Sequence, residues 1–505
     1  MDDMQNISTE TAFEAFLDKL DDTLKTIGYR RGIASFNRLI GEPHENLEKI
    51  NEDSMKVFLN DRHMDVIRHW KDKVTDPRTH RRTQIFYRDF LAAKVENNPE
   101  LFKKANDLES VIVAFQPEIA AKSYSRSELG QILESSPNRD LRKKAYWAGK
   151  KLDDDIEEGV KDLIQTRNSL AKKLGYKDYI EMGFFFQDLD EQELRGLFDT
   201  VKKSTDLLWN ETLENARIKL GVEKLETWDL GYYFHRLMPA PEPERFPKAQ
   251  IIPIFNKALT SAGGNLEKLP IQVIVKDIPY GGLCMGIEYG KDIRILANPR
   301  DGLQWYDALF HEFGHGIHGS LLDTSSYLVA SGDPAFFWEG VAGIFERFVH
   351  QPAFLQEHFA LTPEETEQML FLNKISRIAW FRRIACTCLL EWSAYRNEKN
   401  LREKHADLLE EYTGIRPPEN SGWAGNTLFT THPLYTQNYL LMDVMALHTI
   451  KAFENKFGRY PGPELFNFVV SYYIRPAGWI PWREKIQNAT GSLLSADALV
   501  DYLLS

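Results

Sequence analysis

The segment 307–318 constrains the fold of this chain most, because it contains the pattern His-Glu-x-x-His. Its two histidines, His311 and His315, are four residues apart, so on a helix they share one face with Cβ atoms about 5–6 Å apart. Both imidazoles can then reach one zinc ion at roughly 2.0–2.1 Å. Asp301 with Gln304 predicts the start of this helix as an N-cap and N3 pair. We therefore expect a zinc-binding helix here.

Glu312 directly follows the first histidine, so its side chain would point beside the metal and not at it. A carboxylate in that position can take a proton from metal-bound water, whose pKa the ion lowers to about 7. This combination is typical of zinc peptidases. A histidine on an apolar helix face is also a common core residue, so the hypothesis needs a third ligand.

A catalytic zinc ion takes three protein ligands and one water molecule. The best candidate for the third ligand is Glu339, because it lies within a segment whose apolar residues recur at helical spacing. These residues are Phe336, Phe337, Val341, Ile344, Phe345 and Phe348. Pro334 predicts a break between two antiparallel helices just before this segment. His318 would close the open coordination position if it were a fourth ligand, so we expect it behind the ligands or in the core.

Composition indicates a soluble globular protein of 505 residues, long enough for two or three domains, with 43% hydrophobic and 27% charged residues. The net charge of −12 is spread along the chain and argues against nucleic acid as the main partner. No apolar run approaches about 18 residues, so no membrane partner is expected.

The three cysteines, Cys284, Cys386 and Cys388, have no zinc-ribbon spacing, and we expect no disulfide to hold the fold. The N-terminus shows no basic region followed by an apolar one. We therefore predict a cytoplasmic location. A periplasmic or secreted location would require that a signal peptide had been removed from this sequence.

The proline cluster Pro239, Pro241, Pro243 and Pro247 is the clearest break in the chain. Before it, helical patterns follow one another, including one after Pro137 that Gly175 ends. We therefore divide the chain into an N-terminal helical region, 1–238, and a catalytic region, 239–505, which carries the predicted zinc helices and further helices to the C-terminus.

Two short apolar segments after the prolines, 271–275 and 293–296, predict strands of a small sheet just before the zinc helix. An exposed edge strand can bind an extended peptide through backbone hydrogen bonds. The alternative is a sheet that only supports the helix.

A second chemical segment follows a loop that contains Gly422 and Gly425, which we expect to be mobile. It leads to His432, Tyr435 and Tyr439, and the two tyrosines would share a helix face because they are four apart. Imidazole and phenol donors suit the oxyanion that forms when water attacks a peptide carbonyl. Tyrosines at this spacing are also common in helix cores.

The chain resembles the thimet-oligopeptidase and bacterial oligoendopeptidase family of zinc peptidases from about residue 130 to 450. The most specific part is Phe-His-Glu-Phe-Gly-His, residues 310–315. Other similar segments are the third-ligand helix with its second glutamate, Glu346, and the helical motifs 167–176 and 228–233.

The resemblance implies a mainly α fold of the gluzincin, neurolysin-like type, a helical ellipsoid split by a deep channel with a small β-sheet beside the zinc helix. Residues 1–238 would form one channel wall. It implies one Zn²⁺ per chain and assigns the site as follows: ligands His311, His315 and Glu339, general base Glu312, partners behind the ligands Asp307 and Glu346, and oxyanion donors Tyr439, His432 and Tyr435.

The expected function is therefore zinc-dependent hydrolysis of peptide bonds in short, unstructured oligopeptides. The compressed segment between His432 and Tyr439 leaves open which tyrosine is the donor. The ligand spacing is also similar to that of the angiotensin-converting-enzyme family, which removes dipeptides from C-termini, so that activity is the first alternative. A non-catalytic helical binding protein and a zinc hydrolase of other substrates are the others. The sequence predicts no oligomeric state.

Overall fold

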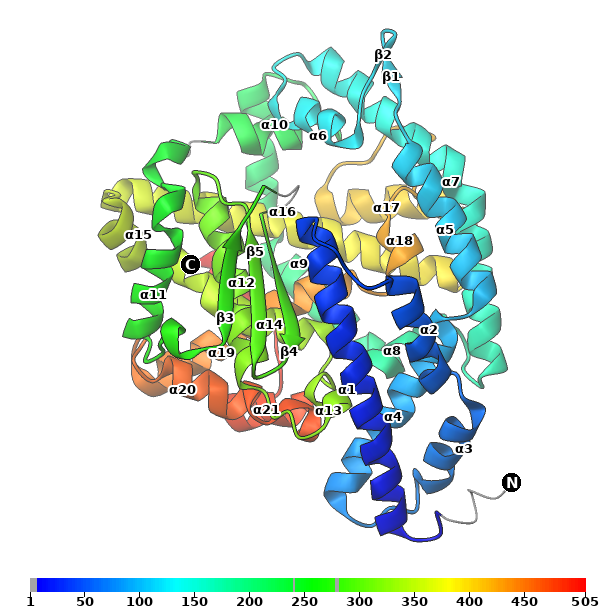
Figure 1. The fold of residues 1–505 in the computed structure, drawn as a ribbon. Helices are drawn as coiled ribbons and strands as arrows, with labels where there is room; N and C mark the ends of the chain where they lie inside the picture. Colours follow the sequence, from blue (N-terminus) through cyan, green and yellow to red (C-terminus); the bar gives the residue numbers. More distant parts are fainter. Residues whose placement is uncertain (1–6, 239–240, 278–280) are drawn as a thin grey trace. The chain divides into compact units, whose positions relative to one another are not determined.

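Helices make up most of the structure, a computed structural model that describes residues 7–238, 241–277 and 281–505 (Figure 1). The predicted mainly α fold with a small sheet beside the zinc helix is confirmed. The three cysteines are free. Among the described residues, no helix has both the length and the apolar character needed to cross a bilayer.

The chain divides into two compact units, each assembled from segments far apart in the sequence. Unit 1 consists of Met1–Asn97, Glu242–Thr362 and Leu441–Ser495, and unit 2 consists of Asn98–Pro241, Pro363–Leu440 and Ala496–Ser505. One change of unit falls in the proline-rich break, although the boundary predicted at Pro239 lies outside the described residues. The units do not coincide with the consecutive regions 1–238 and 239–505. Whether those regions act as channel wall and catalytic region stays a prediction.

Unit 1 contains eleven complete α-helices among its described residues: α1 (Glu10–Ile40), α2 (Leu47–Phe58), α3 (Asp61–Trp70), α4 (Pro77–Glu96), α11 (Ile251–Ser261), α12 (Leu303–Leu321), α13 (Tyr327–Ala330), α14 (Ala335–Glu346), α15 (Pro352–Phe359), α20 (Leu465–Val469) and α21 (Trp482–Thr490). Its short 3₁₀ and π segments are η2 (Pro243–Arg245), η3 (Lys248–Gln250), η4 (Leu266–Lys268), η5 (Arg347–His350), η6 (Val470–Ile474) and η7 (Ala477–Trp479). Helix α19 (Gln437–Phe457) begins in unit 2 and ends in unit 1.

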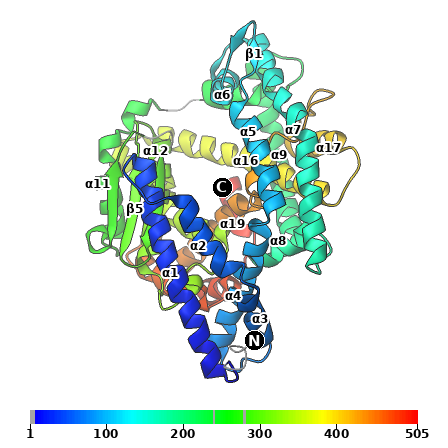
Figure 2. The same cartoon turned by 45° about the vertical axis from the view of Figure 1, so that its right-hand side comes forward.

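Unit 2 contains α5 (Pro99–Ala114), α6 (Arg126–Ser135), α7 (Arg139–Lys173), α8 (Tyr179–Gln187), α9 (Glu191–Leu220), α10 (Leu230–Tyr232), α16 (Pro363–Tyr395), α17 (Leu401–Thr413), α18 (Leu428–Thr431), α22 (Asp497–Leu504) and the π segment η1 (Tyr233–Leu237). A small hairpin joins β1 (Glu118–Ile119) to β2 (Lys122–Ser123). The long helices α7, α9 and α16 run through this unit, and α16 packs against both others (Figure 2). As predicted, Gly175 follows the end of α7, with a φ of +94°.

The sheet of unit 1 has three strands in the order β3 (Ile271–Val275), β5 (Asp292–Ala297), β4 (Gly282–Glu288). β3 and β5 match the two predicted strands, whereas β4 was not predicted. β5 pairs parallel with β3 and antiparallel with β4, so β4 is an edge strand of the sheet. The central strand β5 carries buried side chains on both faces, and only Asp292 and Arg294 are partly exposed. Leu296 packs with Phe36 of α1 on one face, and Ile295 faces α12 on the other.

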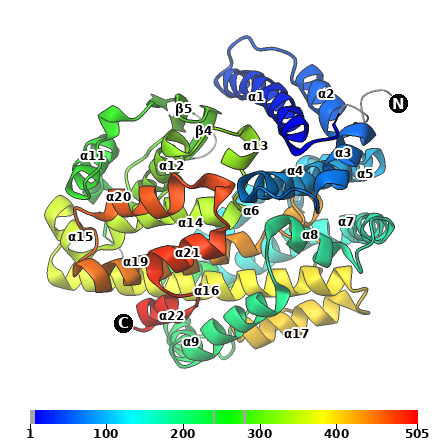
Figure 3. The same ribbon diagram turned by 90° about the horizontal axis from the view of Figure 1, so that it is seen from below.

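Helix α12 lies between the sheet and α14, and small residues let it approach both closely. A Cβ atom at Gly314 would lie 2.6 Å from Cα of Ala342 on α14. On the sheet side, a Cβ atom at Gly316 would lie 3.0 Å from Cδ1 of Ile271. Figure 3 shows α14 among α12, α20 and α21 of the same unit. This packing fixes the distance between the two helices that carry the predicted ligands.

The predicted N-cap of α12 is wrong. The helix begins at Leu303 after Gly302, which has no side-chain cap, and its φ of +126° is one that glycine adopts readily. The carboxylate of Asp301 instead accepts a hydrogen bond from the backbone N–H of Lys248 at 2.8 Å. A tertiary partner therefore competes with the local cap, which the sequence pattern cannot reveal.

A buried ion pair holds the start of α14. Asp333 precedes Pro334, the predicted break residue, which stands at the N-terminus of this helix. Oδ2 of Asp333 lies 2.5 Å from Nζ of Lys485 on α21. The exposed fraction is 1% for the Asp333 side chain and 0% for the Lys485 side chain. Because both charges are removed from water, the loss of either partner would leave the other charge uncompensated.

We expect Gly314→Ala to lower the free energy of unfolding by about 1–3 kcal/mol, because the added methyl group overlaps backbone atoms of α14 that cannot rotate away. Zinc affinity should fall as well, since the change pushes apart the helices that carry the ligands. Urea unfolding and competition with a zinc chelator measure the two effects. The matched control is Gly196→Ala on α9, where a Cβ atom meets nothing within 4 Å. That control should be neutral or stabilising.

Candidate metal centre

The three predicted ligands come together in unit 1. His311 and His315 lie on adjacent turns of α12, and Glu339 faces them from α14. Oε2 of Glu339 lies 3.0 Å from Nε2 of His311 and 3.5 Å from Nε2 of His315. Ligand atoms of a tetrahedral zinc site are about 3.3–3.4 Å apart when each is about 2.1 Å from the ion. The donor set and its spacing therefore fit zinc, and the ligand assignment stays a prediction that this geometry supports.

A second carboxylate lies behind His311. Oε2 of Glu346 is 3.0 Å from Nδ1 of His311, so the Nδ1–H group can donate to it. Such a bond fixes the imidazole tautomer and directs Nε2 towards the metal position. Glu346 is seven residues after Glu339, two turns along α14, so both carboxylates reach the same imidazole ring.

The electrostatics of the centre favour a cation. Burial acts to lower the pKa of His311, but its hydrogen bonds with Glu339 and Glu346 outweigh burial and raise this pKa to about 10. Burial acts to raise the pKa of Glu339, but the two histidines outweigh it and hold this pKa far below its usual range. The two carboxylates thus favour positive charge at the ligand atoms, which a zinc ion supplies.

Asp307 lies one turn before His311 and pairs with a histidine that the sequence analysis did not select. Its Oδ1 is 2.8 Å from Nε2 of His350, and these two residues cluster with Glu346. The predicted place of Asp307 behind the ligands therefore involves His350. The signal for His350 was its position four residues after Glu346, but that spacing alone does not distinguish it from a core residue.

Glu312 is held by the edge strand of the sheet. Its Oε2 accepts a hydrogen bond of 2.7 Å from the backbone N–H of Cys284 on β4. Burial, followed by the charge of Glu312, raises the pKa of the Cys284 thiol well above its usual range. The carboxylate of Glu312 is thereby oriented by a main-chain group, independently of the side chain at position 284.

His318 packs in the core of unit 1. Its ring centre is 5.1 Å from that of Trp338, and its side chain is buried. Burial, followed by the positive charge of Lys485, keeps the pKa of His318 well below its usual range, so this imidazole is neutral. Of the two predicted alternatives, the position favours a core histidine.

The predicted oxyanion residues belong to unit 2, and their rings form a row. The ring centres of His432 and Tyr435 are 6.0 Å apart, and those of Tyr435 and Tyr439 are 5.5 Å apart. The expected helical arrangement is only partly present, because α19 begins at Gln437 and Tyr435 lies in the turn before it. The role of the three residues in catalysis stays a prediction.

The glycine-containing loop before this row is packed against α7. A Cβ atom at Gly422 would lie 2.2 Å from Cβ of Asp153, and the backbone N–H of Gly425 donates to Oδ1 of Asp153 at 3.0 Å. The two glycines allow this close approach to a buried aspartate. Close packing on Asp153 therefore explains the two glycines without the predicted mobility of the loop.

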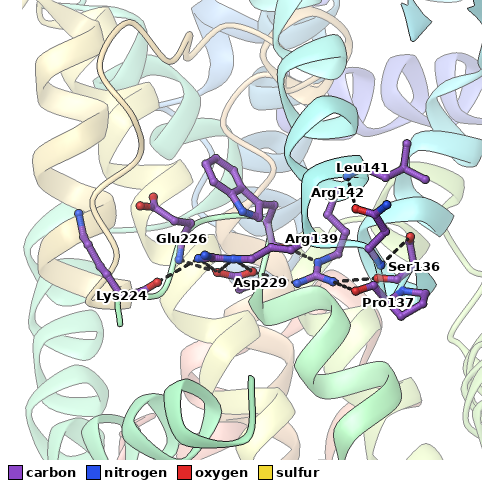
Figure 4. Close-up of polar contacts among 10 residues, drawn as sticks. Ser136, Pro137, Arg139, Leu141, Arg142, Lys224, Glu226 and Asp229 are labelled. Carbon is purple, nitrogen blue, oxygen red and sulfur yellow. Dashed lines mark hydrogen bonds and ion pairs between the residues drawn. The ribbon is translucent and has the colours of Figure 1, made fainter. Parts of the chain in front are cut away.

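The motif 228–233 is a structural centre of unit 2 (Figure 4). Asp229 has an exposed fraction of 0% and accepts hydrogen bonds from Arg139 at 2.7 Å and from Arg142 at 3.0 Å. It also accepts from the backbone N–H of Glu226. These charge-assisted bonds tie the start of α7 to the segment before α10, which accounts for the motif without any part in catalysis.

Comparison with known families supports the resemblance found in the sequence. The model of peptidase family M3 matches residues 132–252, which precede the zinc motif and include the Asp229 centre. The match confirms the resemblance over residues 132–252, and there the chain is similar to this family of zinc metallopeptidases, which includes oligopeptidases. No curated protein matches the chain.

We expect Glu339→Ala to lose zinc together with activity, because it removes one of three ligands. Glu346→Ala should retain the ligands but weaken zinc affinity by about 10–100-fold, because His311 loses the partner that orients it. Competition with a chromogenic chelator measures both affinities. The exposed Glu357 on α15, which pairs only at the surface with Lys257, provides the control variant Glu357→Ala. Full zinc occupancy in Glu339→Ala would exclude this residue as a ligand.

Proposed function

We propose that this relative of peptidase family M3 hydrolyses peptide bonds in short oligopeptides, with zinc held by His311, His315 and Glu339. The observation that carries the proposal is the position of Glu312. It lies beside a donor set with zinc spacing and is oriented by a main-chain hydrogen bond. A carboxylate at this place has the function of a general base and needs no part in metal binding.

Zinc bound at this donor set supplies a Lewis acid, which polarises the peptide carbonyl and lowers the pKa of bound water. Glu312 takes the proton of the attacking water and can return it to the leaving amine. The bond from Cys284 N–H to Oε2 restricts the orientation of the carboxylate, and the other oxygen, Oε1, would take the proton. The hydrogen bond with Glu346 keeps Nε2 of His311 directed at the metal position.

The edge strand β4 supports an extended peptide as the substrate. β4 borders the sheet, and the N–H group of Cys284 reaches Glu312, so this strand passes directly beside the general base. A peptide that adds to this edge would be held by backbone hydrogen bonds, whatever its side chains. Short unstructured peptides can adopt this conformation, whereas a folded protein must first unfold locally.

The dipeptide-releasing activity of the angiotensin-converting-enzyme type is the main alternative. It requires recognition of a free C-terminal carboxylate, whereas an endopeptidase does not. Mass spectrometry of products from one peptide with a free C-terminus and from its amidated form separates the two. Release of dipeptides from the free form alone would favour the alternative. A non-catalytic binding protein would retain zinc and cleave neither peptide.

The predicted setting of the protein is also part of the proposal. The dispersed negative charge argues against a nucleic-acid partner, and the lack of a long apolar run argues against a membrane partner. We propose a cytoplasmic location from the few cysteines and from an N-terminal sequence without a signal-peptide pattern. Size-exclusion chromatography with light scattering would measure the oligomeric state, for which we have no expectation.

We expect Glu312→Gln to keep zinc but lose about 10²–10⁴-fold in turnover of a quenched peptide. The amide can keep the bond to Cys284 N–H, but it cannot accept the proton of water at neutral pH. Zinc content by atomic absorption and kcat on the same sample separate the two effects. Glu357→Gln is the control. Turnover near that of the parent protein would contradict the assignment of the base.

We expect Tyr439→Phe to lower kcat by about 10²–10³-fold, because it removes one hydrogen bond to the oxyanion. KM should change only a few-fold, since the neutral carbonyl of the substrate is a weaker acceptor. Tyr435→Phe is the matched comparison, because the two rings are neighbours. A large loss in Tyr435→Phe alone would exchange the two roles. If neither variant loses kcat, His432 is the next residue to test.

A further inference from the structure

In the sequence, Leu434 lies between His432 and Tyr435, two of the proposed oxyanion residues. Its backbone conformation is unusual. Its φ of +54° is in the left-handed region, which residues with a side chain rarely adopt. A backbone in this region persists only where the surroundings hold it. The contacts of Leu434 therefore bear on the direction in which its neighbours point.

A buried carboxylate holds the N–H side of Leu434. Glu391 on α16 has an exposed fraction of 1%, and its Oε1 accepts a hydrogen bond of 2.8 Å from the Leu434 N–H group. Its other oxygen is buried with no hydrogen-bond partner among the described residues. A carboxylate buried at this cost, for one main-chain bond, indicates that the bond has a specific use.

Glutamine side chains hold the carbonyl side of Leu434. Nε2 of Gln187 on α8 donates to the Leu434 carbonyl at 2.9 Å, and Gln437 at the start of α19 donates to the same oxygen. Oε1 of Gln187 also accepts from Asn438 at 3.2 Å. The N–H group of Leu434 is thus bonded to α16, and its carbonyl group is bonded to α8. The first turn of α19, the helix that carries Tyr439, is also bonded to α8.

The side chain of Leu434 is seated as well. A Cβ atom at Gly183 on α8 would lie 2.5 Å from Cδ1 of Leu434. The leucine side chain therefore packs against α8 at a position where this helix has no side chain. Arg167 on α7 secures the preceding turn, because it donates to the carbonyls of Phe429 at 2.5 Å and Thr430 at 2.6 Å. The residues that anchor this segment therefore come from three helices.

We propose that Glu391 is a positioning residue for the peptidase reaction. Through the Leu434 N–H group it fixes the turn that directs His432, Tyr435 and Tyr439. This inference rests on the proposed function, in which those residues donate to the oxyanion. Glu391 itself touches no reacting atom. Its effect on the rate is the effect of keeping donors in the geometry that the transition state requires.

The charge state of Glu391 decides which substitution is informative. Burial raises the pKa of Glu391 to about 7, against the opposing effects of the Leu434 N–H group and of Arg167. In either protonation state one carboxyl oxygen can still accept from Leu434. Glutamine offers a similar acceptor without charge, whereas leucine fills a similar volume without any acceptor.

The test compares Glu391→Leu with Glu391→Gln in the zinc-loaded protein. We expect Glu391→Leu to lower kcat by about 10–100-fold, with KM within a few-fold, because the donors are displaced. Hydrogen exchange of peptides that cover residues 428–439 should become faster in this variant. Glu391→Gln should restore both the rate and the protection to within about threefold of the parent protein. The exposed Glu398, with the variant Glu398→Leu, is the control.

Hydrogen exchange separates failure of the anchor from failure of the proposed function, because it needs no turnover. Unchanged protection in Glu391→Leu overturns the inference whether or not the protein cleaves peptides. Faster exchange with unchanged kcat also overturns it, since the segment would then be loosened without consequence. If peptides are not cleaved at all while exchange responds as expected, the anchor stands and the proposed function fails.

Two further variants protect the test. If Glu391→Leu does not fold, Gln187→Leu removes one of the two side-chain donors to the Leu434 carbonyl and the acceptor of Asn438, and it should lower kcat and protection in the same direction. An unchanged Gln187→Leu variant would overturn the inference. The double variant Glu391→Leu with Tyr439→Phe should lose little more than the worse single variant, because both act on one interaction. Fully multiplicative losses would show that Glu391 acts elsewhere.

Discussion

The close contact of α12 with α14 is the constraint on which the metal centre depends. Gly314 lies between the two predicted histidine ligands in the sequence and packs against the backbone of Ala342, where no Cβ atom fits. At this separation, the Glu339 carboxylate on α14 lies 3.0 Å from one imidazole nitrogen and 3.5 Å from the other. Helices move less than loops, so the donor atoms keep a spacing that suits one small cation.

The other side of α12 faces a sheet whose edge contributes to the chemistry through its backbone. Cys284 supplies only a main-chain N–H group to Glu312, so the orientation of the base depends on the position of β4 and not on the type of residue at 284. The side chain of Glu346, at the C-terminal end of α14, orients His311 by a hydrogen bond with Nδ1. Two of the predicted site residues, His311 and Glu312, are thus held by groups outside their own helix.

The family match and the metal centre fall on different parts of the chain, and the structure gives a reason. Within residues 132–252, the buried Asp229 forms charge-assisted bonds with the buried Arg142 and the more exposed Arg139, which join α7 to the segment before α10. Residues of this kind are constrained by the fold. Arg167 belongs to the same class, since its guanidinium binds main-chain carbonyls at the end of α18.

The sequence by itself determined the features that depend on local geometry. The pitch of one helix sets the spacing of His311, Glu312 and His315. The apolar residues at helical spacing around position 339 made Glu339 the candidate for the third ligand. Only the tertiary structure decided which groups meet across elements. These contacts are Glu346 with His311, His350 with Asp307, and the N–H group of Cys284 with Glu312. A fourth is the hydrogen bond from the backbone N–H of Lys248 to Asp301, which replaces the predicted helix cap. Such contacts join residues up to 53 positions apart, and no local period encodes them, because they follow from how helices and strands pack.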